Sequence, residues 1–456
     1  MKTYIIVGIS LVALVALLAT NKKLVETLKN IYKIEELRQR ILFTLGLLLI
    51  YRLGSFVTLP GVDHSILEQW TQSFANDGSS LMGLLNIFSG GAFSQASIFA
   101  LGVMPYITAS IIIQLLGIMV PYFRKMQREG ESGRRKMNQW TRFLTIAVLL
   151  LQAPAYLATQ VISSGAVVAT GDFLGIANGQ FIVPAVIILI AGTMFIMWLG
   201  EKITDRGIGN GISLIIMIGI VARLPQSFLQ EFMFQTTGGG SIIMLLVELV
   251  FLALVFMLAI AIVQAVRKIP VQYAKRIVGN KQYGGVRQYI PLKLNAANVM
   301  PIIFAQALMF IPGLIWGGQW LDITSFWYNF TLVVLVIAFT YFYTAIIVNP
   351  QMMADDMKRN GGFIPGVKPG KSTVTYIDDI MTRITLPGSV FLAIITILPA
   401  IAMSLGITQG FAYFFGGTSL LIMVGVVLDT LKQIESYLLM RHYDGLMKTG
   451  RIQGRY

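Results

Sequence analysis

The chain contains an uncharged run of 46 residues, 78–123, which reads GSSLMGLLNIFSGGAFSQASIFALGVMPYITASIIIQLLGIMVPYF. One helix of this length would extend ~69 Å at about 1.5 Å per residue, whereas the apolar core of a bilayer is ~30 Å thick. Gly90-Gly91, in the middle of the run, is typical of a break. We therefore expect a short apolar piece, about 81–88, that enters the membrane region from outside and stops. A full span from residue 95 would follow.

Backbone that enters a membrane and stops is tolerated only where protein buries it or where it lines a water-filled cavity. Residues 81–88 therefore predict a movable stopper in a pore. A helix that lies flat on the outer surface is the alternative that the spacing leaves open.

The composition of the whole chain predicts a polytopic membrane protein. Of its 456 residues, 55% are hydrophobic and 12% are charged, against a usual charged share of ~25%. Mean hydropathy is +0.73. Cysteine is absent and the two histidines, His64 and His442, are far apart in sequence, which excludes disulfides, thiol catalysis and Cys- or His-rich metal sites. We expect no metal or cofactor.

Ten stretches are long and apolar enough to predict membrane-spanning helices, since a span needs ~20 mostly apolar residues. They are 40–58, 95–119, 140–163, 181–200, 208–223, 241–266, 295–315, 329–348, 385–404 and 415–440. An eleventh, weaker stretch lies at 4–20. We expect it to be a retained helix that runs from outside to inside, with a cleaved signal peptide as the alternative.

The basic residues predict the orientation of these spans. Of the 35 Lys and Arg residues, 32 fall in segments on one side of the predicted membrane. The exceptions are Lys2, Arg52 and Arg223. The positive-inside rule makes that side cytoplasmic. The opposite loops are instead expected to hold acidic residues: Asp63, Glu68, Asp77, Asp172, Glu231 and Asp322.

The span count also predicts the domain organisation. Ten spans divide into five and five, and because five is odd the second half is inverted relative to the first, as in inverted-repeat proteins with a site between the halves. We expect an extra segment at 1–23, an N-terminal half at 24–230 and a C-terminal half at 231–456.

Two further segments depart from a plain bundle. The fifth span has only 16 uncharged residues, 207–222, and opens with a Gly-x-Gly-x-Gly run. Short, Gly-interrupted spans indicate central sites in transport proteins, although glycine at a loose helix start is the simpler interpretation. Residues 267–293 carry seven basic residues around Gly279-Asn280, which predicts a hairpin. This finger either docks an acidic or RNA partner, or only signals topology.

The spans contain few groups for chemistry. Glu248 is the only acid well inside a predicted span, and we interpret it as a helix–helix contact. Ion-coupled transport normally needs ionisable residues in the membrane, so a small-molecule transporter is disfavoured. An enzyme is disfavoured because no catalytic constellation falls in or near a span.

Six motifs in order along the chain resemble the SecY family of protein-translocation channels. They read FSGGA at 88–92, ASIFALGVMPYI at 96–107, EGESGRRK at 129–136, RGIGNGIS at 206–213, YAKR at 273–276 and GGTSLLI at 416–422. The resemblance covers about 24–455. It implies a ten-helix, all-α channel of two inverted five-helix halves in a bacterial plasma membrane. The helix expected at 4–20 is additional to this bundle.

The resemblance also implies the roles of particular residues. A plug is expected at about 81–93, and its residues are Leu85, Phe88, Ser89, Gly90 and Gly91. A ring of branched apolar side chains would constrict the pore and exclude water and ions; its members are Val103, Ile107, Ile212, Ile216, Ile303 and Ile422. Gln114 and Gln306 would lie on the helices of a lateral gate that opens toward lipid.

The partners implied by the resemblance bind the cytoplasmic loops 267–293 and 349–383. These loops would receive the ribosome or the SecA ATPase through Lys275, Arg276, Lys281 and Lys368. SecE and SecG are the expected small subunits, and preproteins are the cargo. Two features depart from the family. Lys368 stands where an arginine is usual, which removes a planar fork for carboxylates and phosphates. The helix at 4–20 is one that most members lack, and a lineage-specific partner is one explanation for it.

Overall fold

The computed structural model describes residues 34–63, 65–67, 86, 89–167, 178–237, 241–273, 276–278, 281–283, 287–316 and 324–448. The predicted helix at 4–20 lies outside these residues. The chain forms two compact units, each described by itself below. The smaller unit combines Met1–Leu53, Met197–Ile215 and Val426–Tyr456, and the larger combines Gly54–Ile196 and Ile216–Gly425.

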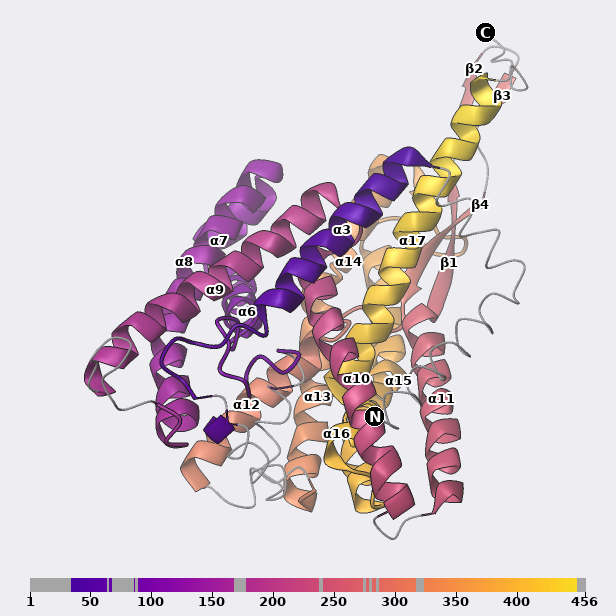
Figure 1. Cartoon of the computed structure of the whole chain (residues 1–456). Helices are drawn as coiled ribbons and strands as arrows, with labels where there is room; N and C mark the ends of the chain where they lie inside the picture. The colour runs from indigo at the N-terminus through magenta and orange to yellow at the C-terminus, as the bar shows by residue number, and fades with distance from the viewer. Residues whose placement is uncertain are drawn as a thin grey trace. The chain divides into compact units, whose positions relative to one another are not determined.

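Helices lie at all ten predicted spans (Figure 1). They are α3 (Glu35–Gly54), α6 (Met104–Met119), α8 (Glu131–Tyr156), α9 (Asn178–Arg206), α10 (Gly211–Thr237), α11 (Ile242–Gln264), α12 (Met300–Trp316), α13 (Phe326–Ile347), α15 (Lys371–Ser404) and α17 (Gly417–Lys448). Among the described residues, seven helices are long and apolar enough to span a membrane alone, and α6 with α7 (Pro121–Arg128) makes an eighth, bent candidate. The prediction of a helical, multi-pass membrane protein is confirmed.

Short elements complete the described fold. A π-helical turn, η1 (Leu157–Ile162), continues α8, while α14 (Pro350–Arg359) and α16 (Gln409–Ala412) lie between the long helices. The strands are β1 (Val266–Tyr273), β2 (Arg276–Val278), β3 (Lys281–Tyr283), β4 (Arg287–Lys293) and β5 (Gly362–Phe363).

The second span begins later than predicted. We expected a helix from residue 95, but residues 89–103 form turns and α6 begins at Met104. Several residues of this stretch have positive φ, among them Gly91 at 96°, Ala96 at 44° and Gly102 at 55°. A right-handed helix cannot include such residues, whereas Pro105 suits the first turn of a new one.

The fifth span is longer than predicted. We expected about 16 residues ending near Ala222, but α10 has 27 residues and continues to Thr237. Arg223 and Glu231 therefore lie within a helix, and Glu231 is not in an outer loop. Both charged side chains find polar partners, Arg223 in the side chains of Asn86 and Ser94, and Glu231 in Gln235. These partners lower the cost of placing charged residues in a membrane helix.

Glu248 joins α11 to α10, as predicted. The amide of Gln235 in α10 donates to Glu248 Oε1 at 3.0 Å and to Glu231 Oε1 at 2.8 Å. Glu231 Oε2 accepts from the backbone N–H of Thr408 at 2.8 Å. All three side chains are at most 4% exposed. This network links α10, α11 and the segment before α16. Glu248, which the sequence presented as the only acid well inside a span, therefore has a buried acidic neighbour in Glu231.

In the smaller unit, the Gly-x-Gly-x-Gly run forms a tight turn between α9 and α10. The backbone N–H of Ile208 donates to Thr44 Oγ1 of α3 at 3.1 Å, and that of Gly209 donates to Gln433 Oε1 of α17 at 2.8 Å. A Cβ on Gly211 would lie 2.0 Å from the carbonyl oxygen of Gly200. The glycines therefore permit backbone close approach, which favours the simpler of the two interpretations of this run.

We predict opposite effects for alanine at two glycines of the smaller unit. Gly211→Ala should lower the free energy of unfolding by about 1–3 kcal/mol, because the new methyl overlaps a backbone carbonyl. Gly46→Ala, in α3, should leave it unchanged or raise it by about 0.5–1 kcal/mol, since no atom lies within 4 Å of its Cβ position. Thermal unfolding in detergent measures both. Equal losses of stability in the two variants would contradict the assignment of the turn.

Candidate functional site

Residues 89–103 form a buried, irregular segment within the larger unit. Its backbone is paired with neighbouring elements: Leu59 N donates to the carbonyl of Ala96 at 2.9 Å, and Ile98 N donates to that of Val57 at 2.9 Å. The hydroxyl of Tyr156, at the end of α8, donates to the carbonyl of Phe93 at 2.7 Å. This segment includes the end of the predicted plug, and the protein supplies hydrogen-bond partners to its backbone.

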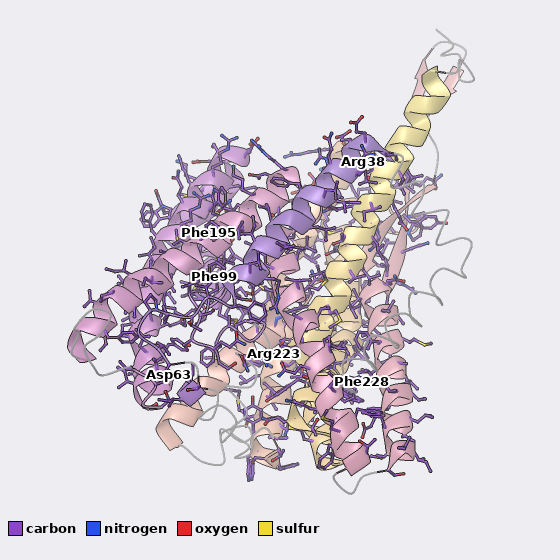
Figure 2. The ribbon with its side chains drawn as sticks, in the orientation of Figure 1. Arg38, Asp63, Phe99, Phe195, Arg223 and Phe228 are labelled. Carbon is purple, nitrogen blue, oxygen red and sulfur yellow. The ribbon has the colours of Figure 1, made fainter. Side chains whose placement is uncertain are left out.

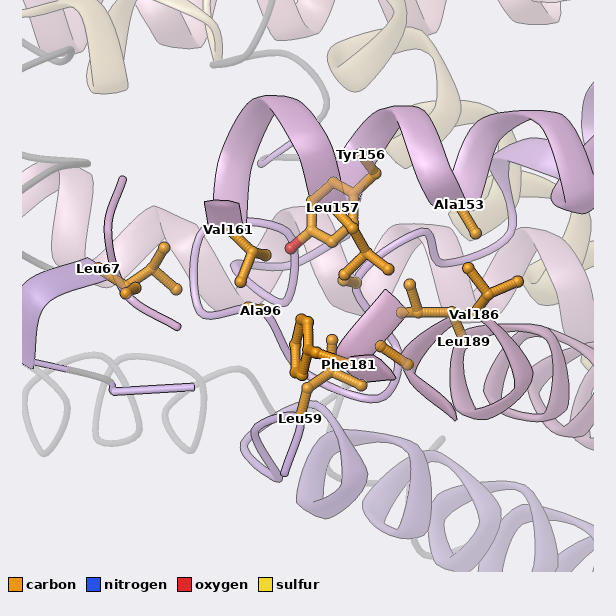
Figure 3. Close-up of a cluster of buried hydrophobic side chains, with 13 residues drawn as sticks. Leu59, Leu67, Ala96, Ala153, Tyr156, Leu157, Val161, Phe181, Val186 and Leu189 are labelled. Atoms are coloured by element: carbon orange, nitrogen blue, oxygen red, sulfur yellow. The ribbon is translucent and has the colours of Figure 1, made fainter. Parts of the chain in front are cut away.

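A hydrophobic cluster holds this segment in place (Figure 3). Tyr156, Leu157 and Val161, from the end of α8 and from η1, lie opposite Phe181 and Leu189 of α9. Ala96 and Ala100 are at most 1% exposed within the cluster. Close approach adds to this packing, because a Cβ on Gly192 of α9 would lie 2.1 Å from the carbonyl oxygen of Ile98. The segment therefore rests against α8 and α9.

Aromatic contacts add to the same packing. The rings of Phe93 and Tyr156 have centroids 4.8 Å apart, and Phe99 stacks on Phe195 of α9 at 6.0 Å. Figure 2 labels Phe99 and Phe195, which lie next to each other there. Sequence reasoning did not identify Tyr156 or Phe195 as residues that fix the segment after the plug, since only the folded chain brings them to it.

The predicted plug is described only in part. Leu85 and Phe88 lie outside the described residues. Ser89 is 4% exposed, and its hydroxyl accepts from the N–H of Phe93 at 3.0 Å. Gly90 and Gly91 both have positive φ, at 65° and 96°. The described end of the predicted plug is thus an ordered turn in which glycine is required.

The six predicted ring residues lie on four helices and one helix start. Val103 caps α6, Ile107 lies in its first turn, Ile216 is on α10, Ile303 on α12 and Ile422 on α17. Val103, Ile216 and Ile422 are 7–8% exposed, and Ile107, Ile212 and Ile303 are partly buried. Ile212 belongs to the smaller unit and the other five to the larger. All six are thus wholly or partly buried, which core packing also explains, and their membership of one ring stays a prediction.

The two predicted gate residues have different surroundings. Gln114 is exposed on α6, and its amide donates to Ser110 Oγ of the same helix at 3.4 Å. Gln306 of α12 lines a small cavity with Tyr328 and Asn329 of α13. The remaining lining residues are Leu332, Thr396, Pro399, Tyr413, Gly416, Gly417, Thr418 and Ser419.

The cytoplasmic loops predicted to dock partners pack together through a sheet. β1 pairs with β4 along the first loop (Figure 1). β5, from the second loop, pairs with the other edge of β1, where Gln272 lies opposite Phe363. Beneath the sheet lies a small core of Ile269, Val271, Leu292, Met357, Ile364, Ile377 and Met381. Sequence reasoning treated the two loops separately and did not predict this shared core.

Helix α15 carries part of this core into the cytoplasm. It has 34 residues, which is ~51 Å at 1.5 Å per residue and exceeds a ~30 Å bilayer core. Ile377 and Met381 lie in its first three turns. One continuous helix therefore joins the membrane bundle to the sheet.

The predicted hairpin is confirmed at its strands. β2 and β3 pair antiparallel with Val278 opposite Lys281, and Gly279 and Asn280 lie outside the described residues. Arg276 lies on β2 and Lys281 on β3, whereas Lys275 lies outside the described residues. Lys368 is exposed in the second loop, whose turn includes Gly366 and Gly370 at positive φ.

Exposed basic residues predominate on this cytoplasmic part. Among the described side chains of the two loops, the exposed basic residues are Arg267, Lys268, Lys293, Lys358, Arg359, Lys368, Lys371 and Arg383, and the exposed acidic residues are Asp355, Asp356, Asp378 and Asp379. The excess of positive charge suits an anionic surface.

Comparison with known proteins shows similarity over most of the chain. The SecY family model matches residues 97–431. Curated relatives named "Protein translocase subunit SecY" include that of Corynebacterium glutamicum, 41% identical over 91% of this chain and 98% of the relative. Those of Streptomyces scabiei and Mycobacterium tuberculosis are 44% and 42% identical over 91% of this chain and 98% and 97% of the relatives.

Solved structures show the same fold at lower identity. The structure titled "The structure of a protein conducting channel" is 18% identical, covers 87% of this chain and 91% of its own, and has a TM-score of 0.58. Sec61 in the canine ribosome–channel complex from the endoplasmic reticulum is 17% identical at the same coverage, with a TM-score of 0.52. The motifs, the ten helices, the family model and the curated relatives all agree, and the chain belongs to the SecY family.

Proposed function

We propose that this chain is the channel-forming subunit of a bacterial protein translocase. It passes unfolded secretory polypeptides across the plasma membrane and releases hydrophobic segments sideways into lipid. The observation that carries the proposal is the irregular, buried segment 89–103 ahead of α6 in a helical membrane bundle. Such backbone is stable in a membrane only inside protein or beside a water-filled path.

The apolar ring supports a passive channel. Side chains such as Val103, Ile216 and Ile422 are branched, apolar and packed, and a constriction of such groups excludes water and ions yet yields to a chain that presses through it. Residues 24–230 and 231–456 form the two halves of this channel, with a division that falls inside α10. The plug comprises about 81–93, and Gln114 and Gln306 lie on the gate helices.

A small-molecule transporter is the weaker alternative. Its strongest support is the buried pair of Glu231 and Glu248, since buried carboxyls can carry protons. However, Gln235 donates to both carboxylates and Thr408 to one, so the pair bridges helices. Within the described residues no cluster of three or more His, Cys, Asp or Glu side chains could hold a metal ion.

The cytoplasmic sheet is the proposed docking platform. The shared core joins strands β1 and β4 of the first loop to the Lys368 loop in one body. Ribosomal RNA and the SecA ATPase are the partners of the basic residues Lys275, Arg276, Lys281 and Lys368, because phosphates and carboxylates are attracted to such a surface. Two of the structural neighbours are ribosome-bound complexes by title. SecE and SecG complete the membrane complex.

Reconstitution tests the proposed function. Proteoliposomes that contain this chain with SecE should import a preprotein when SecA and ATP are added, because the chain supplies the path and SecA the energy. Protease protection of the preprotein measures import, and liposomes without the chain are the control. Uptake of small solutes without import of preprotein would instead support the transporter.

A charge reversal tests the docking platform. Lys368→Glu should weaken SecA or ribosome binding roughly tenfold at low salt, and less at high salt, because the loop tip would then repel an anionic partner. Lys368→Arg should keep or increase affinity, since it restores the planar fork. Arg134→Glu, an exposed basic residue of α8 outside the two docking loops, is the matched control. Affinity that Lys368→Glu leaves unchanged would remove this loop from the platform.

A further inference from the structure

Arg223 of α10 is hydrogen-bonded to the described end of the proposed plug. Its Nη2 donates to Asn86 Oδ1 at 2.8 Å and to Ser94 Oγ at 3.1 Å. Both acceptors lie on either side of Gly90-Gly91 in the sequence. Arg223 is labelled in Figure 2. The sequence did not predict this contact. It showed only that Arg223 is one of three basic residues that do not fit the cytoplasmic distribution of positive charge.

Asn86 organises the turn to which Arg223 binds. Its carbonyl accepts from the N–H of Gly91 at 2.9 Å and from the hydroxyl of Ser89 at 3.2 Å. Its side-chain Oδ1 accepts from the N–H of Ser94 at 3.3 Å as well as from Arg223. Asn86 is therefore hydrogen-bonded to residues 89–94, and the guanidinium binds both Asn86 and Ser94.

Close contact at Gly91 shows that the guanidinium lies against the backbone of this turn. A Cβ on Gly91 would lie 2.6 Å from Nη2 and 2.9 Å from Cζ of Arg223. Gly91 also has a φ of 96°, which side chains rarely tolerate. Glycine is thus favoured at this position for two reasons: the turn needs a positive φ, and a side chain would overlap Arg223.

The position of Arg223 along α10 places it above the proposed ring. Seven residues separate it from Ile216, and at 100° per residue this returns to within 20° of the same helix face, about 10 Å closer to the outer end. A cation within a membrane helix is costly unless it faces polar groups or water. Asn86 and Ser94 provide such groups, and both belong to the turn of the proposed plug.

We propose that Arg223 is a positioning residue that holds Asn86 and residues 89–94 in place while the channel is closed, so that opening must break its hydrogen bonds to Asn86 and Ser94. The inference rests on the proposed function, because it assigns this contact to the closed state of the same pore. Arg223 thereby sets how easily the plug leaves.

A fixed positive charge above the ring could instead act only by repelling cations, and the two mechanisms predict different results. A hydrogen-bonded latch depends on Asn86, which has no charge. A charge barrier depends on the charge of Arg223 alone and does not change the accessibility of the turn to a neutral reagent.

Single-channel and ensemble conductance in planar bilayers measure the closed state. With wild-type SecE present, Arg223→Ala and Asn86→Ala should each raise resting conductance, by about tenfold for the loss of charge-assisted hydrogen bonds. The resting conductance of the double variant should be only slightly higher than that of either single variant, because both substitutions remove the same contact. The resting conductance of Arg223→Lys should lie between that of wild type and that of Arg223→Ala, since lysine keeps the charge but loses the planar fork. Gln226→Ala, exposed on the same helix, should match wild type.

A second measurement follows the turn itself. The chain has no cysteine, so Ala92→Cys provides a single thiol, and Ala92 is 1% exposed. A neutral, water-soluble maleimide should label this thiol several-fold faster when Arg223→Ala or Asn86→Ala is added. Labelling does not require preprotein transport, so it remains informative if the reconstitution assay for the proposed function fails.

Three outcomes would overturn the latch. Wild-type conductance in both Arg223→Ala and Asn86→Ala would remove the contact from the closed state. High conductance in Arg223→Ala with wild-type conductance in Asn86→Ala would assign the effect to charge. Unchanged labelling of Ala92→Cys in both backgrounds would show that the turn does not move. If Arg223→Ala does not fold, Asn86→Ala and Arg223→Lys still decide the question.

Discussion

A bilayer offers no hydrogen-bond partners to an exposed backbone, and this constraint governs the segment that joins the end of the proposed plug to α6. Fifteen residues, 89–103, leave the helical conformation inside a membrane bundle. Their N–H and carbonyl groups must therefore be satisfied by the protein or by water. The structure supplies partners from Val57 and Leu59, from the hydroxyl of Tyr156 and from within the turn that Asn86 organises.

Irregular backbone of this kind is tied to its neighbours more directly than a helix is. A helix keeps its hydrogen bonds within itself, so displacing it breaks only side-chain contacts. A turn held by a few contacts from other elements has a definite resting position and a limited number of bonds to break. The backbone of this segment needs hydrogen-bond partners from other elements. We infer that this dependence makes the segment suitable as the base of a movable plug.

Charge and polarity explain where sequence reasoning succeeded. Uncharged stretches located all ten helices, and the basic residues identified the cytoplasmic loops and the β2–β3 hairpin around Gly279-Asn280. These signals are local, since each span and each turn depends on residues close together in the sequence. The family resemblance supplied the ring, plug and gate residues, which composition and spacing alone would not distinguish from ordinary core residues.

The misses share one cause, which is that partners distant in sequence changed the cost of a local feature. Arg223 suggested that the fifth span ends at residue 222, but Asn86 and Ser94 satisfy it, and α10 continues. Glu231 suggested an outer loop, but Gln235 and Thr408 bury it within the protein. The core shared by the two cytoplasmic loops was missed for the same reason, because Ile269 and Ile377 meet only in the folded chain.

The central claim is that an apolar ring keeps the resting channel closed. Resting ion conductance of Ile107→Ser with Ile212→Ser in planar bilayers tests it most directly, with Leu151→Ser, a 78% exposed residue of α8, as the control for loss of an apolar side chain. The account predicts a marked rise in conductance for the ring pair, because two hydroxyls allow water into the constriction, and wild-type conductance for the control. Wild-type conductance of the ring pair would contradict it.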